Sequence, residues 1–122
     1  MNITKEIVNE IPIASVDSNE IVITDSNSAL DFMMTIRYNH DCDYIILNKK
    51  ALSDDFFELS TKIAGDVLQK IVNYGMKVAI IGDYSLYDSK ALSDFMFESN
   101  KGLYLFFVST KEDAIEKLIE KS

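Results

Sequence analysis

The clearest feature of the chain is three largely apolar runs, at residues 44–47, 76–81 and 103–108, of which only the second contains a charged residue, Lys77. A strand that is covered on both faces has this pattern, because its side chains point alternately to the two faces and both are buried. Around these runs, apolar residues recur every three or four positions, as they do along one face of a helix. The pattern therefore predicts strands that alternate with helices.

Four segments have helical spacing. The strongest lies within residues 53–75, and Gly75 follows it as a residue that readily ends helices. Its apolar side chains form two adjacent rows on one face: Leu59, Ile63, Val67 and Ile71, then Ala64, Leu68 and Val72. The others are predicted at about residues 26–39, at about residues 88–100, and after Thr110, which is placed to cap the last helix.

The first 16 residues contain two β-prone runs, 3–8 and 11–16, which are separated only by Asn9 and Glu10. A two-residue spacer that begins with Asn is typical of a hairpin. Pro12 has no N–H to donate, so we expect it at an edge or at the start of its strand. These runs predict an antiparallel hairpin ahead of the α/β pattern.

Taken together, the elements predict a single α/β domain over residues 1–122, with a mixed, mostly parallel sheet and about four helices. An N-terminal antiparallel hairpin adds one edge to that sheet. This order of elements resembles the STAS domain, the fold of anti-sigma-factor antagonists and of the cytosolic tails of sulfate transporters. The resemblance implies a regulatory module that binds other proteins.

Individual segments resemble an uncharacterised bacterial family catalogued as domain of unknown function 4180. The matching segments lie in the last two thirds of the chain: DDFFELSTKIAGDVLQK (54–70), IGDYS (81–85), SKAL (89–92), ESNKG (98–102) and FFV (106–108). That family has no assigned activity, so the resemblance does not predict one for this chain.

Charge and cysteine content restrict the classes of partner. The net charge is −8, a field that repels nucleic acid and anionic membrane surfaces, so we expect neither as a partner. Cys42 is the single cysteine, which leaves no intramolecular disulfide and no Cys-rich metal site. No segment reaches the roughly 20 apolar residues of a membrane span, and we expect a cytoplasmic protein without a cofactor.

The carboxyl ends of the parallel strands are the first place to expect a ligand. That rim is predicted to carry Asn48, Lys49, Asp83 and Tyr84, together with Asp25 from an earlier loop. Short polar residues also suit loops and helix caps, so a purely structural role is the simpler alternative.

A second candidate is Ser60-Thr61, near the predicted start of the strongest helix. STAS antagonists carry Asp-Ser-Ser-Gly-Leu there and are phosphorylated on the second serine, and the resemblance places Thr61 at that position, with Ser60 beside it. Leu59 replaces the acid and Lys62 replaces the glycine. A helix N-terminus stabilises a phosphate, so a switch is physically reasonable, and the alternative is an ordinary residue at a helix start.

The third candidate is an interaction surface made of Phe56, Phe57, Glu58 and Phe97. Adjacent side chains point in different directions, so we expect one of Phe56 and Phe57 to be exposed, and Phe97 lies away from the buried row of its helix. Such aromatic residues anchor protein partners or a second copy of the chain, although crevices between helices also accommodate them.

Catalysis has little support in the sequence. His40 and Cys42 are the single residues of their types, and we assign no catalytic residue and no metal ligand. The acids Asp54, Asp55 and Glu58 are explained by a helix start. We therefore expect a non-catalytic interaction or regulatory module, with protein binding controlled by phosphorylation. The alternative is a domain or enzyme that uses the rim for a small molecule.

Overall fold

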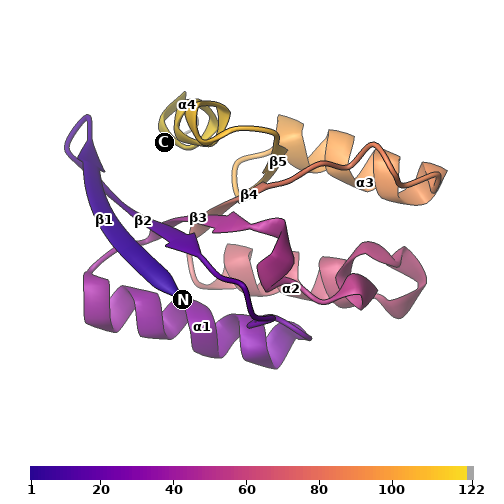
Figure 1. Ribbon diagram of the computed structural model, residues 1–122, viewed down its shortest axis with the longest axis horizontal. Helices are drawn as coiled ribbons and strands as arrows, with labels where there is room; N and C mark the ends of the chain where they lie inside the picture. Colours follow the sequence, from indigo (N-terminus) through magenta and orange to yellow (C-terminus); the bar gives the residue numbers. More distant parts are fainter. Residues whose placement is uncertain (121–122) are drawn as a thin grey trace.

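The computed structural model describes residues 1–120. Its centre is a five-stranded sheet in the order β1-β2-β3-β4-β5, the same as the order in the chain. The strands are β1 (Asn2–Val8), β2 (Ile11–Asp17), β3 (Tyr44–Asn48), β4 (Lys77–Ile81) and β5 (Leu105–Val108). β1 and β2 pair antiparallel and every later pair is parallel, which confirms the predicted mixed sheet (Figure 1).

The hairpin forms as predicted because its two turn residues accept left-handed backbone. Asn9 and Glu10 both have positive φ, at 51° and 69°, the conformation of a two-residue turn that matches strand twist. Pro12 pairs with Ile7 of β1, while pairing between β2 and β3 begins only at Ile13. Pro12 therefore lies near the start of its strand, ahead of the first β2–β3 pair.

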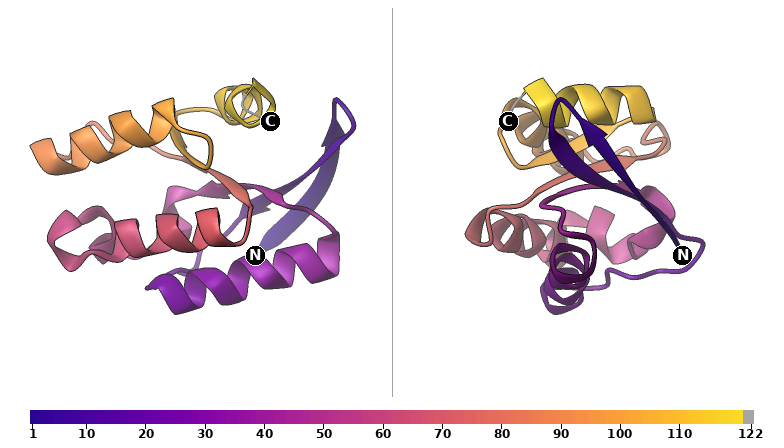
Figure 2. Two further views of the ribbon diagram at one scale, coloured as in Figure 1. Left: turned by 180° about the vertical axis from the view of Figure 1, so that it is seen from behind. Right: turned by 90° about the vertical axis from the view of Figure 1, so that its left-hand side faces the viewer.

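Three helices lie on one face of the sheet and one lies on the other. They are α1 (Ser26–His40), α2 (Ile63–Asn73), α3 (Lys90–Lys101) and α4 (Lys111–Glu120). Buried side chains of α1, α2 and α3 share one core cluster, whereas those of α4 belong to a second cluster. Figure 2 shows α1 and α2 on one side of the strands and α4 on the other. Successive right-handed crossovers that advance in one direction along a sheet place their helices on the same face.

The helix starts follow local capping chemistry, with one exception. Asp25 and Ser28 form a reciprocal capping box at α1, Ser89 caps α3, and the Thr110 hydroxyl accepts from Asp113 N–H. α2 begins only at Ile63, after Lys62 in a left-handed conformation. The prediction that Leu59 belongs to this helix is therefore wrong, whereas Gly75, with φ of 65°, follows α2 as predicted.

Three short 3-10 turns fill the space between β3 and α2: Lys49–Ala51, Asp54–Phe57 and Leu59–Thr61. They lead Phe56 into the main core, where its ring lies 6.3 Å from that of Phe107. Phe57 belongs to the same core, with its ring centroid 4.9 Å from that of Phe56, and it stacks on Tyr87 at 5.3 Å. Both phenylalanines are buried, with exposures of 0% and 5%, so the prediction that one of them is exposed is wrong.

A side chain pairs one residue on the outer edge of β5. Asn100 of α3 accepts from Phe107 N–H at 2.7 Å and donates to the Phe107 carbonyl at 3.1 Å. Both backbone groups of Phe107 are thereby paired, and an unpaired edge strand is a template for association with another chain.

Replacing Asn100 by Ala should lower the free energy of unfolding by about 1–3 kcal/mol, because both Phe107 backbone groups lose their partner. Urea unfolding measures this loss. Asn73→Ala is the matched control, since Asn73 lies at the end of α2 and its side chain, within residues 1–120, accepts from the exposed Gln69 side chain alone. Equal stability of the two variants would contradict this role of Asn100.

Candidate functional site

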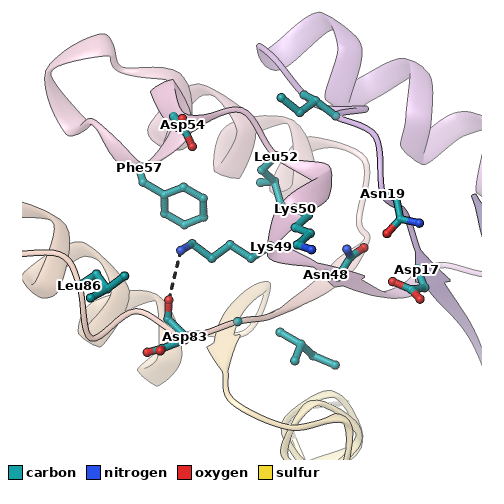
Figure 3. Close-up of a pocket in the computed structure, with 13 residues that line it drawn as sticks. Asp17, Asn19, Asn48, Lys49, Lys50, Leu52, Asp54, Phe57, Asp83 and Leu86 are labelled. Atoms are coloured by element: carbon teal, nitrogen blue, oxygen red, sulfur yellow. Dashed lines mark hydrogen bonds between the residues drawn. The ribbon is translucent and has the colours of Figure 1, made fainter.

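A cleft of about 640 Å³ opens at the carboxyl ends of β2, β3 and β4 (Figure 3). The end of β2 and the loop after it contribute Asp17, Asn19 and Ile21. The end of β3 and the segment after it contribute Asn48, Lys49, Lys50, Leu52, Asp54 and Phe57, and the loop after β4 contributes Gly82, Asp83 and Leu86 next to Ile81. Because parallel strands end at the same side of the sheet, three loops that are far apart in sequence converge here.

Asn48 fixes the loop after β2. Its side-chain oxygen accepts from Ser18 N–H at 2.8 Å, and its amide nitrogen donates to the Ser18 carbonyl at 2.6 Å. Ser18 is buried, and its hydroxyl donates to the Glu20 carbonyl at 2.7 Å. Asn48 therefore lines the cleft as predicted for a rim residue, but its polar atoms hold a wall of the cleft in place.

Lys49 fixes the loop after β4. Its ammonium donates to the Asp83 carbonyl at 3.1 Å and lies over the rings of Tyr87, Phe57 and Tyr84, at 4.5, 5.5 and 6.0 Å from their centroids. Figure 3 shows the side chain reaching from the end of β3 between Phe57 and Asp83. Its stem passes so close to Gly82 that a Cβ there would lie 2.7 Å from the Lys49 Cβ.

Asp83 and Tyr84 have different surroundings although they are neighbours. The Asp83 carboxylate accepts from Ser85 N–H at 2.9 Å, and hydrogen bonds from Ser85 hold its pKa below the ordinary value. The Tyr84 hydroxyl donates to the Ile80 carbonyl at 2.7 Å, and burial raises its pKa. The Tyr84 ring packs against Phe57 and Phe107, and the residue does not line the cleft, contrary to its predicted role as a contact.

The remaining lining combines charge with apolar walls. Asp17, Asp54 and Asn19 are exposed at the mouth together with Lys50, and Leu52 and Phe57 form a buried wall. Two apolar side chains, Ile21 and Leu86, are exposed by 56% and 85%. An apolar interior with a few oriented polar groups is the usual construction of a small-molecule site.

The sequence pattern did not identify the residues that follow β2. Asp25 was expected on the rim, but it caps α1 and does not line the cleft. Asp17 and Asn19 occupy that position, and the end of the β-prone run at Val16 was the signal that could have located them. Nothing in the local pattern of residues 84–87 indicates that Leu86 is the exposed residue.

Thr61 and Ser60 lie outside the cleft, in the last 3-10 turn before α2. The Thr61 hydroxyl oxygen lies 2.8 Å from the Asp55 carbonyl and 2.7 Å from that of Glu58, and it accepts from Ile63 N–H at 3.3 Å. A phosphate on Thr61 would have to break these bonds. Ser60 donates to the Glu58 carboxylate at 3.4 Å, and phosphorylation of either residue stays a prediction.

A second, shallower groove of about 250 Å³ separates α2 from α3. Its walls include Leu68, Val72, Phe95 and Leu103. Phe97 lies two residues after Phe95 on α3 and is 61% exposed. The Lys101 ammonium lies 4.3 Å from the centroid of its ring. Of the predicted interaction surface, Phe97 and Glu58 are exposed while Phe56 and Phe57 are buried.

The other side chains considered for catalysis or metal binding, a cysteine and three acids, do not form a site. Cys42 is buried, its thiol donates to the His40 carbonyl at 3.3 Å, and burial raises its pKa. The acids Asp54, Asp55 and Glu58 do not converge, and within residues 1–120 no group of three His, Cys, Asp or Glu side chains could hold a metal ion. None of the helices described is both long enough and apolar enough to cross a bilayer.

Comparison with known proteins decides the family. The family model described as Domain of unknown function (DUF4180) matches residues 8–118. The chain belongs to the DUF4180 family. No curated protein and no solved structure matches it. Membership of DUF4180 confirms the family resemblance of the sequence segments, whereas the resemblance to STAS domains stays a prediction.

Gly82→Ala should lower the free energy of unfolding by about 1–3 kcal/mol, because the new Cβ would lie within 2.8 Å of the Lys49 Cβ and Cδ atoms. Gly65→Ala is the matched control: it adds the same methyl within α2, where nothing lies within 4 Å. That change should raise stability by about 0.5–1 kcal/mol through helix propensity. Chemical denaturation of both variants tests the packing, which is contradicted if Gly82→Ala is neutral.

Proposed function

We propose that this DUF4180 chain is a cytosolic regulatory module that binds a small molecule in the rim cleft. The observation that carries the proposal is the convergence of three loops on one cleft of about 640 Å³ at the carboxyl ends of adjacent parallel strands. Its size falls within the range of small-molecule sites, and its position is the usual one for ligands of open α/β sheets.

The arrangement of the side chains supports binding more than chemistry. Asn48 and Lys49 are tied to backbone groups of the flanking loops, so they define a wall and a floor. The carboxylates of Asp17 and Asp54 and the ammonium of Lys50 at the mouth are able to orient a polar ligand over the apolar walls. A cleft whose walls are fixed before the ligand arrives reduces the ordering cost of binding.

A second candidate function is docking of a protein partner on the groove between α2 and α3. It is supported by the exposure of two apolar side chains of the groove lining, Val72 at 37% and Leu103 at 51%. Phe97 on α3 is 61% exposed but does not line the groove. Clusters of exposed apolar residues mark interaction surfaces. This function is the one that the STAS resemblance implies, and phosphorylation of Thr61 or Ser60 would be its switch.

Two variants with opposite expected effects test these functions. Ile21→Ser with Leu86→Ser removes the exposed apolar walls of the cleft at little cost in stability, because both side chains already face solvent. In a thermal-shift screen of metabolites, a compound that binds in the cleft should stabilise the wild-type protein and the groove variant Leu103→Ser but not this double variant.

Protein capture from cells gives the reciprocal result for the second function. A partner of the groove should be lost by Leu103→Ser, which changes an exposed side chain of the groove lining, and retained by the double variant. If every stabilising compound acts equally on the wild type and on the double variant, the cleft is not the binding site and the proposal fails.

A further inference from the structure

We propose that the ligand of the rim cleft is a small organic cation, an ammonium with a short apolar body, whose charge takes the position that the Lys49 ammonium now holds. This inference rests on the proposed function and specifies the class of molecule that the cleft binds. The protein itself provides the first observation: a primary ammonium already lies over the rings of Phe57, Tyr84 and Tyr87. Aromatic faces attract cations through the negative potential above the ring.

The ring cluster is reached from two sides. A neighbouring hollow of about 350 Å³ shares Asp54, Phe57 and Leu86 with the cleft, and Tyr87 lines it. Leu86, which is 85% exposed, lies in the lining of both. A ligand with one charged end and one apolar end could therefore place the charge on the rings and the apolar body against Leu86.

Charge around the rings favours a cation. Asp54 and Asp83 line the cleft, and Glu58 and Asp88 line the neighbouring hollow. Lys50, at the mouth of the cleft, is the basic residue of the lining besides Lys49. The net charge of −8 adds a long-range field that attracts cations to the molecule and repels anions.

Lys49 is bound in a way that allows exchange. Its ammonium donates to one neutral acceptor, the Asp83 carbonyl, and is absent from the ion pairs found in residues 1–120. A ligand ammonium offers the same donor and the same charge to the same groups. Its entry would release Lys49 toward solvent and free the loop after β4, which links ligand binding to a change at the surface of the module.

Lys49→Met tests the inference because methionine keeps an unbranched apolar stem beside Gly82 and removes the competing charge. The probe is n-butylammonium, titrated into ¹⁵N-labelled protein at low salt, with butyrate and butan-1-ol as probes of the same length but different charge. Butylammonium should bind Lys49→Met about tenfold more tightly than the wild type, with the largest amide shifts at Gly82, Asp83 and Tyr87.

Two further variants separate the ring cluster from general electrostatics. Lys50→Met removes the same charge from the mouth of the cleft and should change the affinity by no more than about twofold, because that side chain is exposed to screening solvent. Adding Tyr87→Leu to Lys49→Met should abolish the tenfold gain while the rest of the amide spectrum stays unchanged.

The outcomes that overturn the inference differ from those that overturn the proposed function. Equal gains in Lys49→Met and Lys50→Met, or tighter binding of butyrate or butan-1-ol at the cleft amides, would exclude an organic cation on the rings and would leave the cleft as a binding site. If no probe shifts the cleft amides in any variant, both the cation and the small-molecule cleft are contradicted.

Discussion

The cleft depends on the last residue of the central strand and on the residue that follows it. Asn48 pairs both of its polar ends with the backbone of Ser18, and Lys49 donates to the backbone of Asp83. These two side chains reach to opposite sides, so a single strand end holds the loops of both neighbouring strands. The bonds to Ser18 are partly buried and therefore costly to leave unmade, which makes Asn48 the strong constraint on the shape of the rim, whereas the bond from Lys49 to Asp83 is exposed.

The segment between β3 and α2 is anchored by rings. Phe56 and Phe57 both belong to the main core, and Phe57 also contacts Tyr84 and Tyr87, the rings over which the Lys49 ammonium lies. The acids of the same segment remain at the surface. Acidic residues and phenylalanines can be adjacent in this segment because the 3-10 turns direct the rings into the core. The carboxylates stay at the surface, around the openings of the two hollows.

Long apolar runs and helical periodicity were sufficient to predict the strands, the four helices and the rim at which the cleft lies, because burial on one or two faces leaves a regular trace in the sequence. The burial of both Phe56 and Phe57 was not predictable in this way, since it depends on 3-10 turns and on rings from β5 and the loop after β4. The same limit applies to Asn48 and Tyr84. Asn48 meets its partner Ser18 only through the tertiary fold. Tyr84 bonds the Ile80 carbonyl because its side chain turns inward.

The most direct test of this account is amide hydrogen exchange of the loop after β2 in Asn48→Ala, with Asn19→Ala in the same loop as the control. The Ser18 amide donates to Asn48, so its exchange should become faster by about tenfold or more in Asn48→Ala and should not change in Asn19→Ala. If the Ser18 amide stays as protected in Asn48→Ala as in the wild type, the end of β3 does not hold the wall of the cleft.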